Sequence, residues 1–215
     1  MKKQNYSYIG ISLVILLFGI YAVPKIVGHF KTADLHTFSK VPDFQFINQK
    51  GETITNKDYE GKVYVVEFFF TTCPTICPIM KRKMITIQNE FMGNPRFGIA
   101  SFSINPEIDT PEQLNTYASR NGINHKNWHL LTGKPKDIVY DFSTNGFKLP
   151  AGEGGTDHGG LFHSGNFALV DKKGYIRSRY DDKGNAIFVY RALDEHGLTD
   201  QITELKQDIK LLLNE

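Results

Sequence analysis

The sequence predicts an α/β sandwich around a central mixed sheet, preceded by one N-terminal transmembrane helix. Two apolar runs, at residues 63–70 and 97–104, are rich in Val, Ile and Phe and are typical of buried strands. Helical patterns alternate with these runs, and a hairpin pattern at residues 167–179 follows them. Residues 41–215 suffice for one domain with a substantial core. We therefore expect one globular domain behind a membrane anchor.

The N-terminal segment is expected to be an uncleaved anchor. Lys2 and Lys3 precede the uncharged stretch 8–23, which Ile26 and Val27 extend toward the roughly 20 residues that a span needs. Residues 21–24 form a poor signal-peptidase site, although a cleaved signal peptide remains the alternative. The lysines should keep residues 1–7 in the cytoplasm. These features predict a single-pass protein of the cell inner membrane, spanning it with residues 8–27 and exposing its soluble domain on the extracytoplasmic (periplasmic) side.

The elements of the domain follow from local patterns. Thr110 and Pro111 suit the cap and first position of a helix, and the chain ends in an amphipathic helix with Ile202, Leu205, Ile209 and Leu212 on one stripe. In chain order we expect a tether (28–40), a hairpin (44–47 and 52–55), a strand (63–70), a helix (74–92), a strand (97–104), a helix (111–121), a short strand (128–131), a helix (135–142), a hairpin (167–170 and 175–179) and a final helix (199–213).

The charge balance argues against a nucleic-acid-binding protein. The formal net charge is +2, but Lys2, Lys3 and Lys25 belong to the predicted anchor segment. The remaining chain is nearly neutral and contains no basic cluster, so no nucleic-acid partner is expected.

The only two cysteines, Cys73 and Cys77, directly follow the strand at 63–70. Pro74 suits the first position of a helix, which would place Cys73 at the helix N-terminus and favour its thiolate. Cys77 would then lie one turn away on the same face, so the pair could hold one soft metal ion or close into a disulfide. Pro78 is expected to bend the helix just past the site. Outside the cytoplasm the disulfide is the expected resting state in the absence of metal or a reductase.

Four motifs together resemble the SCO/SenC family of thioredoxin-like copper-binding proteins that act in cytochrome oxidase assembly. They are Cys73-x-x-x-Cys77-Pro78, the segment 103–112 ending in Asp109-Thr-Pro-Glu112, Trp128-His-Leu-Leu-Thr-Gly133, and Phe162-His163-Ser164 before the hairpin at 167–179. The resemblance implies a thioredoxin-like fold for residues 41–215 and copper, Cu(I) or Cu(II), as the bound metal. It also implies that the copper-bearing subunit of cytochrome c oxidase is the partner, with a copper donor protein and a thiol reductase as further candidates.

Histidine is the expected third ligand, because Cu(II) prefers nitrogen in addition to two thiolates. The resemblance favours His163, which stands directly before a strand that can fix its position. His158 is the alternative, because it lies in a glycine-rich loop (150–160) and forms the Asp-His pair that many family members carry at the metal-binding histidine. The chain contains five further histidines, to which we assign no ligand role: His29, His36, His125, His129 and His196.

Two other interpretations of the cysteine pair stay open. The chain could be a thiol-disulfide oxidoreductase or peroxidase, in which Cys73 attacks and Cys77 resolves the mixed disulfide. The three-residue spacing and the nearby histidine argue against this enzyme. A membrane-tethered module that only binds another protein is a third interpretation. Asp109 is expected either to position the cysteine loop or contact a partner, or only to favour the start of the helix at 111–121.

Overall fold

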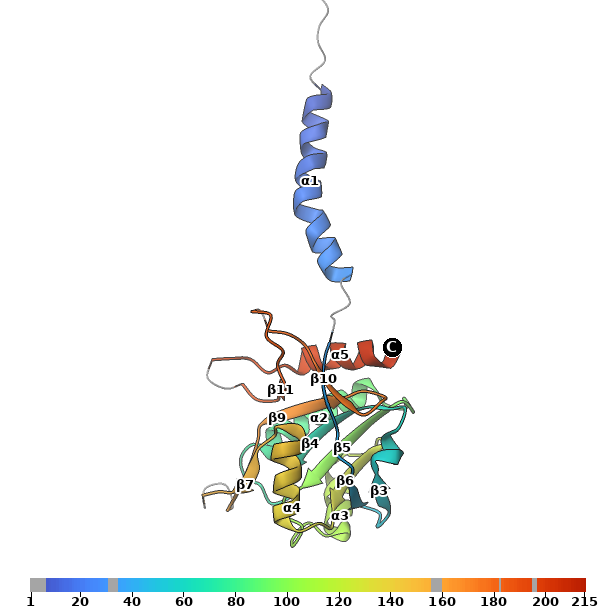
Figure 1. Ribbon diagram of the computed structural model, residues 1–215, viewed down its shortest axis with the longest axis vertical. Coiled ribbons are helices and arrows are strands. Elements are labelled where there is room, and N and C mark those ends of the chain that lie inside the picture. The colour runs from blue at the N-terminus through green and yellow to red at the C-terminus, as the bar shows by residue number, and fades with distance from the viewer. Residues whose placement is uncertain (1–6, 31–34, 156–159, 182, 195–196) are drawn as a thin grey trace, which may run out of the picture. The chain divides into compact units, whose positions relative to one another are not determined.

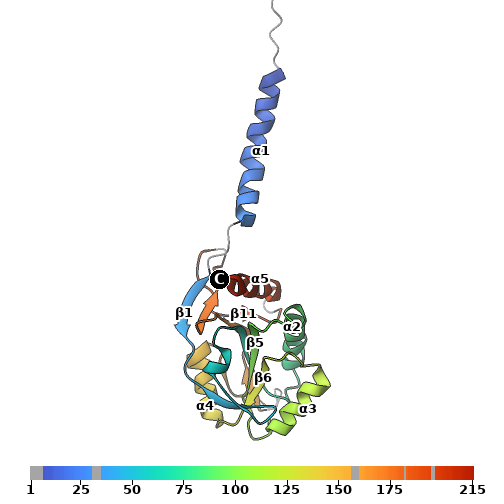
Figure 2. The same cartoon turned by 90° about the vertical axis from the view of Figure 1, so that its right-hand side faces the viewer.

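The computed structural model describes residues 7–30, 35–155, 160–181, 183–194 and 197–215. The chain divides into two compact units, Met1–Asp34 and Leu35–Glu215, which we describe separately. Figures 1 and 2 show the elements of both.

The described residues of the first unit form one helix, α1 (Ser7–Phe30), which includes the stretch predicted to cross a membrane. The described large apolar side chains on this helix, from Ile11 to Tyr21, are more than half exposed. Even so, no helix in the described part of the chain combines the length and the apolar character that a membrane crossing requires. The predicted transmembrane anchor is therefore not confirmed.

The second unit is built on a mixed sheet, as predicted. Its strands lie in the order β1-β10-β9-β4-β5-β6-β2-β3, and β11 pairs with β9. The pairs β4–β5 and β5–β6 are parallel, while all other pairs in this sheet are antiparallel. The strands are β1 (His36–Lys40), β2 (Gln45–Asn48), β3 (Thr53–Thr55), β4 (Val63–Phe69), β5 (Phe97–Ser103), β6 (Trp128–Thr132), β9 (Asn166–Val170), β10 (Tyr175–Ser178) and β11 (Tyr190–Arg191).

Helices cover both faces of the sheet. Alternate side chains of strand β4 point to opposite sides, and all of them are buried because both sides are covered. Phe69 and Glu67 face α2 (Cys77–Glu90) and α3 (Pro111–Asn121), with which they line one crevice. Phe68 faces the other way and packs against Phe142 and Phe147, which follow α4 (Lys136–Asp141). The two layers are visible on either side of β5 and β6 in Figure 2.

Several elements agree closely with the sequence predictions. Helix α3 has the predicted bounds, Thr110 accepts a hydrogen bond from the backbone N–H of Gln113 at 3.3 Å, and Gly122 ends the helix in a left-handed conformation (φ 68°). All four residues of the predicted apolar stripe on α5 (Ile202–Asn214) are buried. In each case the signal lies in residues that are close together in the sequence.

The start predicted for the helix at 74–92 was wrong. Helix α2 begins at Cys77, and residues 70–76 form a loop. Pro74 therefore lies outside the helix, and Pro78 falls in the first turn, where its missing N–H costs no hydrogen bond. Pro78 therefore does not break a hydrogen bond within α2, and the expected bend of the helix just past the site loses its cause.

Two strand pairings were missed. Strand β1 lies within the expected tether at 28–40 and pairs with β10, with His36 opposite Ser178. Strand β7 (Ala151–Glu153) lies within the predicted glycine-rich loop at 150–160 and forms a separate two-stranded sheet with β8 (Leu161–His163), which directly follows that loop. A π-helix at Phe142–Gly146 also continues α4 beyond the predicted element.

Candidate metal centre

The two cysteines lie where the chain leaves the carboxyl end of β4. Cys73 is in the loop, where its backbone N–H donates to the carbonyl of Phe70 at 3.3 Å. Cys77 is the first residue of α2. Both side chains are buried. The loop therefore turns the two sulfurs back toward the protein interior, and Cys73 is not at the N-terminus of the helix as the sequence suggested.

The short sheet β7–β8 brings His163 to the same place. His163 is the last residue of β8 and pairs with Ala151 of β7, and the backbone N–H of Ser164 donates to the carbonyl of Pro150 at 2.8 Å. Strand β9 begins at Asn166 and runs antiparallel to β4. The start of β9 therefore lies beside the end of β4, which places His163 next to the cysteine loop.

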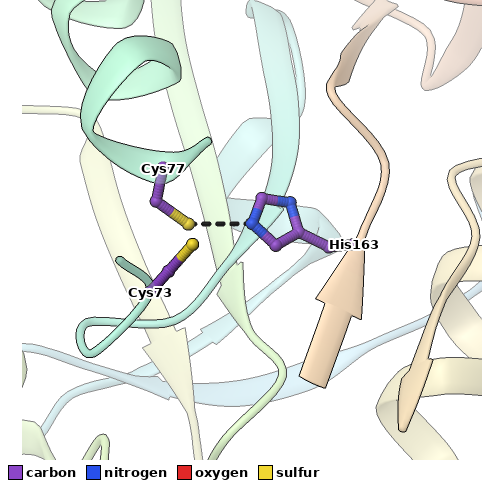
Figure 3. Close-up of side chains that lie close together, drawn as sticks. All are labelled: Cys73, Cys77 and His163. Carbon is purple, nitrogen blue, oxygen red and sulfur yellow. Dashed lines mark hydrogen bonds between the residues drawn. The ribbon is translucent and has the colours of Figure 1, made fainter. Parts of the chain in front are cut away.

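These three side chains form one cluster. The two Sγ atoms and a ring nitrogen of His163 all lie within 4.8 Å of one another, and His163 Nε2 is 2.8 Å from Cys77 Sγ. Figure 3 shows both sulfurs directed at the imidazole. The structure thus brings together the residues named from the sequence, although they come from three separate segments.

A backbone carbonyl orients the imidazole of His163. Its Nδ1 lies 3.1 Å from the carbonyl oxygen of Ser164, which can only accept a hydrogen bond. Nδ1 is therefore the donor in this contact, and Nε2 is the ring nitrogen directed at the sulfurs. The residue before His163, Phe162, has no carboxylate to offer, and Ser164 supplies the orienting contact instead.

The two thiols influence each other's ionisation. A hydrogen bond from Cys77 holds the pKa of Cys73 far below its usual range, and the same bond, together with burial, raises the pKa of Cys77. Within the pair, the first thiolate to form is therefore favoured on Cys73. This low pKa has its origin in Cys77 and not in the helix N-terminus that the sequence suggested.

Asp109 holds the start of the cysteine loop. Its side chain is fully buried and accepts hydrogen bonds from the backbone N–H and the hydroxyl of Thr71, and from the hydroxyl of Ser103. Burial raises the pKa of Asp109, although these hydrogen bonds oppose the shift. Of the roles considered for this residue, positioning of the loop is the one that its contacts support.

Sequence reasoning missed a second buried carboxyl group, Glu67. It lies on β4 and accepts a hydrogen bond from Ser101 Oγ at 2.7 Å, and Ser101 in turn accepts one from the indole N–H of Trp128. Glu67 and Cys77 line the same narrow crevice. Burial raises the pKa of Glu67 to about 7. A charged residue within an otherwise apolar strand was the available sequence signal.

The other described histidines whose side chains can be assigned make contacts elsewhere. His36 lies beside the Tyr180 hydroxyl, His125 beside the carbonyl of Phe91, and His129 beside the amide of Asn48. His158, the alternative third ligand, lies outside the described residues. Two sulfurs and one imidazole nitrogen are a donor set suited to a soft or borderline ion and unsuited to Mg²⁺ or Ca²⁺, which prefer oxygen.

Comparisons with known proteins agree with this geometry. The SCO1/SenC family model matches residues 32–196. A SCO1 protein homolog of Bacillus subtilis (strain 168) is 33% identical over 151 residues, covering 68% of this chain and 76% of the relative.

Two solved structures illustrate the shared fold. BsSco, described as a member of the Sco family of cytochrome c oxidase assembly proteins, gives a TM-score of 0.68 at 26% identity, covering 84% of this chain and 96% of its own. ScoI of Bradyrhizobium japonicum, solved with copper bound, gives a TM-score of 0.61 at 22% identity, covering 81% of this chain and 100% of its own. This chain therefore has the thioredoxin-like Sco fold.

The raised pKa of Glu67 predicts a pH-dependent stability. The folded state retains the proton up to about pH 7, whereas the unfolded chain releases it near its ordinary value of 4.5. Stability contributed by this group is therefore present below the unfolded pKa and is lost as pH rises through 7. Glu67→Gln should remove this loss and be more stable than the wild type at pH 8.5, by on the order of 2–3 kcal/mol.

Urea unfolding of the reduced, metal-free protein at pH 5.5 and pH 8.5 measures the effect. The exposed Glu60→Gln is the matched control and should follow the wild type at both pH values. Parallel pH profiles for Glu67→Gln and the wild type would contradict the prediction.

Proposed function

This chain belongs to the SCO1/SenC family, and on that premise we propose that it binds copper and helps to assemble the dinuclear copper centre of cytochrome c oxidase. The observation that carries the proposal is the convergence of Cys73, Cys77 and His163 in one buried cluster. The related fold of ScoI, a protein solved with copper bound, supports the choice of metal. The copper-bearing oxidase subunit is the proposed recipient.

The donor atoms account for the binding of both oxidation states. Two sulfur ligands suit Cu(I), and the Nε2 of His163 adds the nitrogen that Cu(II) prefers. The lowered pKa of Cys73 favours its thiolate, and Cys77, whose pKa is raised, has to release its proton when the ion binds. Ser164 keeps the His163 ring in the tautomer whose lone pair faces the ion.

We also propose that the domain acts on the extracytoplasmic side of the cell inner membrane, held there by the N-terminal segment. Lys2 and Lys3 before the apolar stretch support this orientation. In that compartment oxidation of Cys73 and Cys77 to a disulfide would remove the thiolates and release the metal. Membrane fractionation followed by protease accessibility tests the location.

The first test of the metal site is anaerobic titration of the reduced protein with copper, followed by absorption and EPR spectroscopy. We expect one Cu(I) or one Cu(II) per chain at the same place, and Cys73→Ser or Cys77→Ser should abolish both. His163→Ala should weaken Cu(II) binding far more than Cu(I) binding, because two sulfurs suffice for the monovalent ion.

His158→Ala is the control for this titration and should change little. Stoichiometric copper binding by Cys73→Ser would locate the site elsewhere. A larger loss of Cu(II) affinity in His158→Ala than in His163→Ala would transfer the third ligand to His158.

The competing enzyme, a thiol-disulfide oxidoreductase or peroxidase, draws support from the thiolate character of Cys73. A strain that lacks this protein separates the two functions. Copper delivery requires both Cys77 and His163, so Cys77→Ser and His163→Ala should each fail to restore oxidase activity. A pure thiol reductase requires Cys77 alone, and full activity with His163→Ala would therefore favour the enzyme.

A further inference from the structure

A cavity of about 190 Å³ opens beside two of the three clustered residues. Cys73 and His163 line it, together with Phe70, Thr75 and Ile76 of the cysteine loop and the first two residues of β8. Cys77 is not part of its lining and instead borders the crevice on the other side, at Glu67. An apolar cavity of about 150 Å³ accommodates a benzene-sized ligand, so this one has room for a single long side chain.

The lining selects for an uncharged occupant. Among the described residues that line the cavity, all but Cys73, Thr75 and His163 are apolar, and none is an acid, a lysine or an arginine. A carboxylate entering here would lose its hydration with few donors to replace it, and an ammonium group would lose its hydration with few acceptors to replace it. A neutral, largely apolar side chain avoids both costs.

Two phenyl rings add a preference for sulfur. Phe70 is buried at the cysteine loop, whereas Phe162 on β8 remains 43% exposed. Gly152 of β7 pairs with Phe162, and a Cβ added at Gly152 would lie 3.0 Å from Cε1 of the Phe162 ring. The Phe162 ring thus packs over Gly152, which leaves room for it because it has no side chain. Thioether sulfur makes favourable contacts with aromatic rings.

We propose that this cavity receives a methionine side chain from the protein that exchanges copper with this chain. The inference rests on the proposed function and adds the chemistry of the incoming ligand. A thioether is neutral, flexible and soft, so it satisfies the lining and can also bind Cu(I).

The exchange step balances without any co-reactant. The thioether sulfur donates a lone pair to the Cu(I) ion as the bond from the ion to Nε2 of His163 breaks. Copper stays monovalent, and no proton moves, because neither the thioether nor the imidazole changes its protonation state. The two cysteine sulfurs retain the ion until the partner supplies further ligands.

The test uses the full-length, reduced chain with and without one equivalent of Cu(I), under anaerobic conditions. The probes are N-acetyl-methionine-N-methylamide and its norleucine analogue, which replaces the sulfur by a methylene group. Binding is followed by the NMR shift of the ¹³C-labelled terminal methyl group. On the copper-loaded chain we expect the methionine probe to bind about tenfold more tightly than norleucine, which corresponds to about 1.4 kcal/mol. On the copper-free chain the two should differ by less than about threefold, since only ring contacts then favour sulfur.

Phe162→Ser tests the location and should weaken binding of the methionine probe at least about fivefold, because it removes one wall of the cavity. Ile138→Ser is the matched control: Ile138 is also an exposed apolar residue, at 51%, but it lies on α4 outside the cavity lining. It should leave binding unchanged. Copper stoichiometry and circular dichroism of both variants verify the fold.

Equal affinity of the two probes for the copper-loaded chain would overturn the proposal, as would unchanged binding to Phe162→Ser. Failure of the chain to take up Cu(I) at all would instead refute the proposed function. In that case, titration of the copper-free chain still tests whether the cavity binds a side chain. Saturable binding of the methionine probe that is lost in Phe162→Ser supports a side-chain site, and its absence overturns the inference.

Discussion

The pairing of β4 with both of its neighbours is the constraint on which the metal centre depends. Parallel pairing with β5 fixes the point where β4 ends at Phe69 and the cysteine loop begins. Antiparallel pairing with β9 brings the start of β9, and with it His163, to the same end of β4. Because β4 is buried along its whole length, neither segment can shift without exposing apolar surface.

Two buried carboxyl groups, those of Asp109 and Glu67, influence the cluster in different ways. Asp109 is bound to the loop itself, through the N–H and hydroxyl of Thr71, and therefore fixes the point where the loop leaves the sheet. Glu67 makes no hydrogen bond to the loop and acts on it only through charge, which its raised pKa makes sensitive to pH near neutrality. Asp109 thus holds the backbone at the start of the loop, whereas the negative charge of Glu67 contributes to the raised pKa of Cys77.

The thiolate on Cys73 and the apolar cavity beside it are consequences of one loop conformation. Since α2 begins only at Cys77, the loop is free to turn Cys73 toward Cys77 and to leave space beyond it. A helix starting at Pro74 would have stabilised the same thiolate through the helix dipole. In the structure the hydrogen bond from Cys77 lowers the pKa of Cys73 instead, so the ionisation of Cys73 depends on the protonation state of Cys77.

The sequence alone determined the features that neighbouring residues encode. The buried runs of β4 and β5, the capped helix α3 and the apolar stripe of α5 were predicted because capping and periodicity are local effects. Cys73 and Cys77 were singled out by their position directly after a strand, and the resemblance to a known family favoured His163. Tertiary structure decided the start of α2, the pairing of β1 with β10 and of β7 with β8, and the contacts of Asp109, Glu67 and Ser164. The pairing of β1 with β10 and the contacts of Asp109 and Glu67 join segments far apart in the chain, for which local propensity carries no signal.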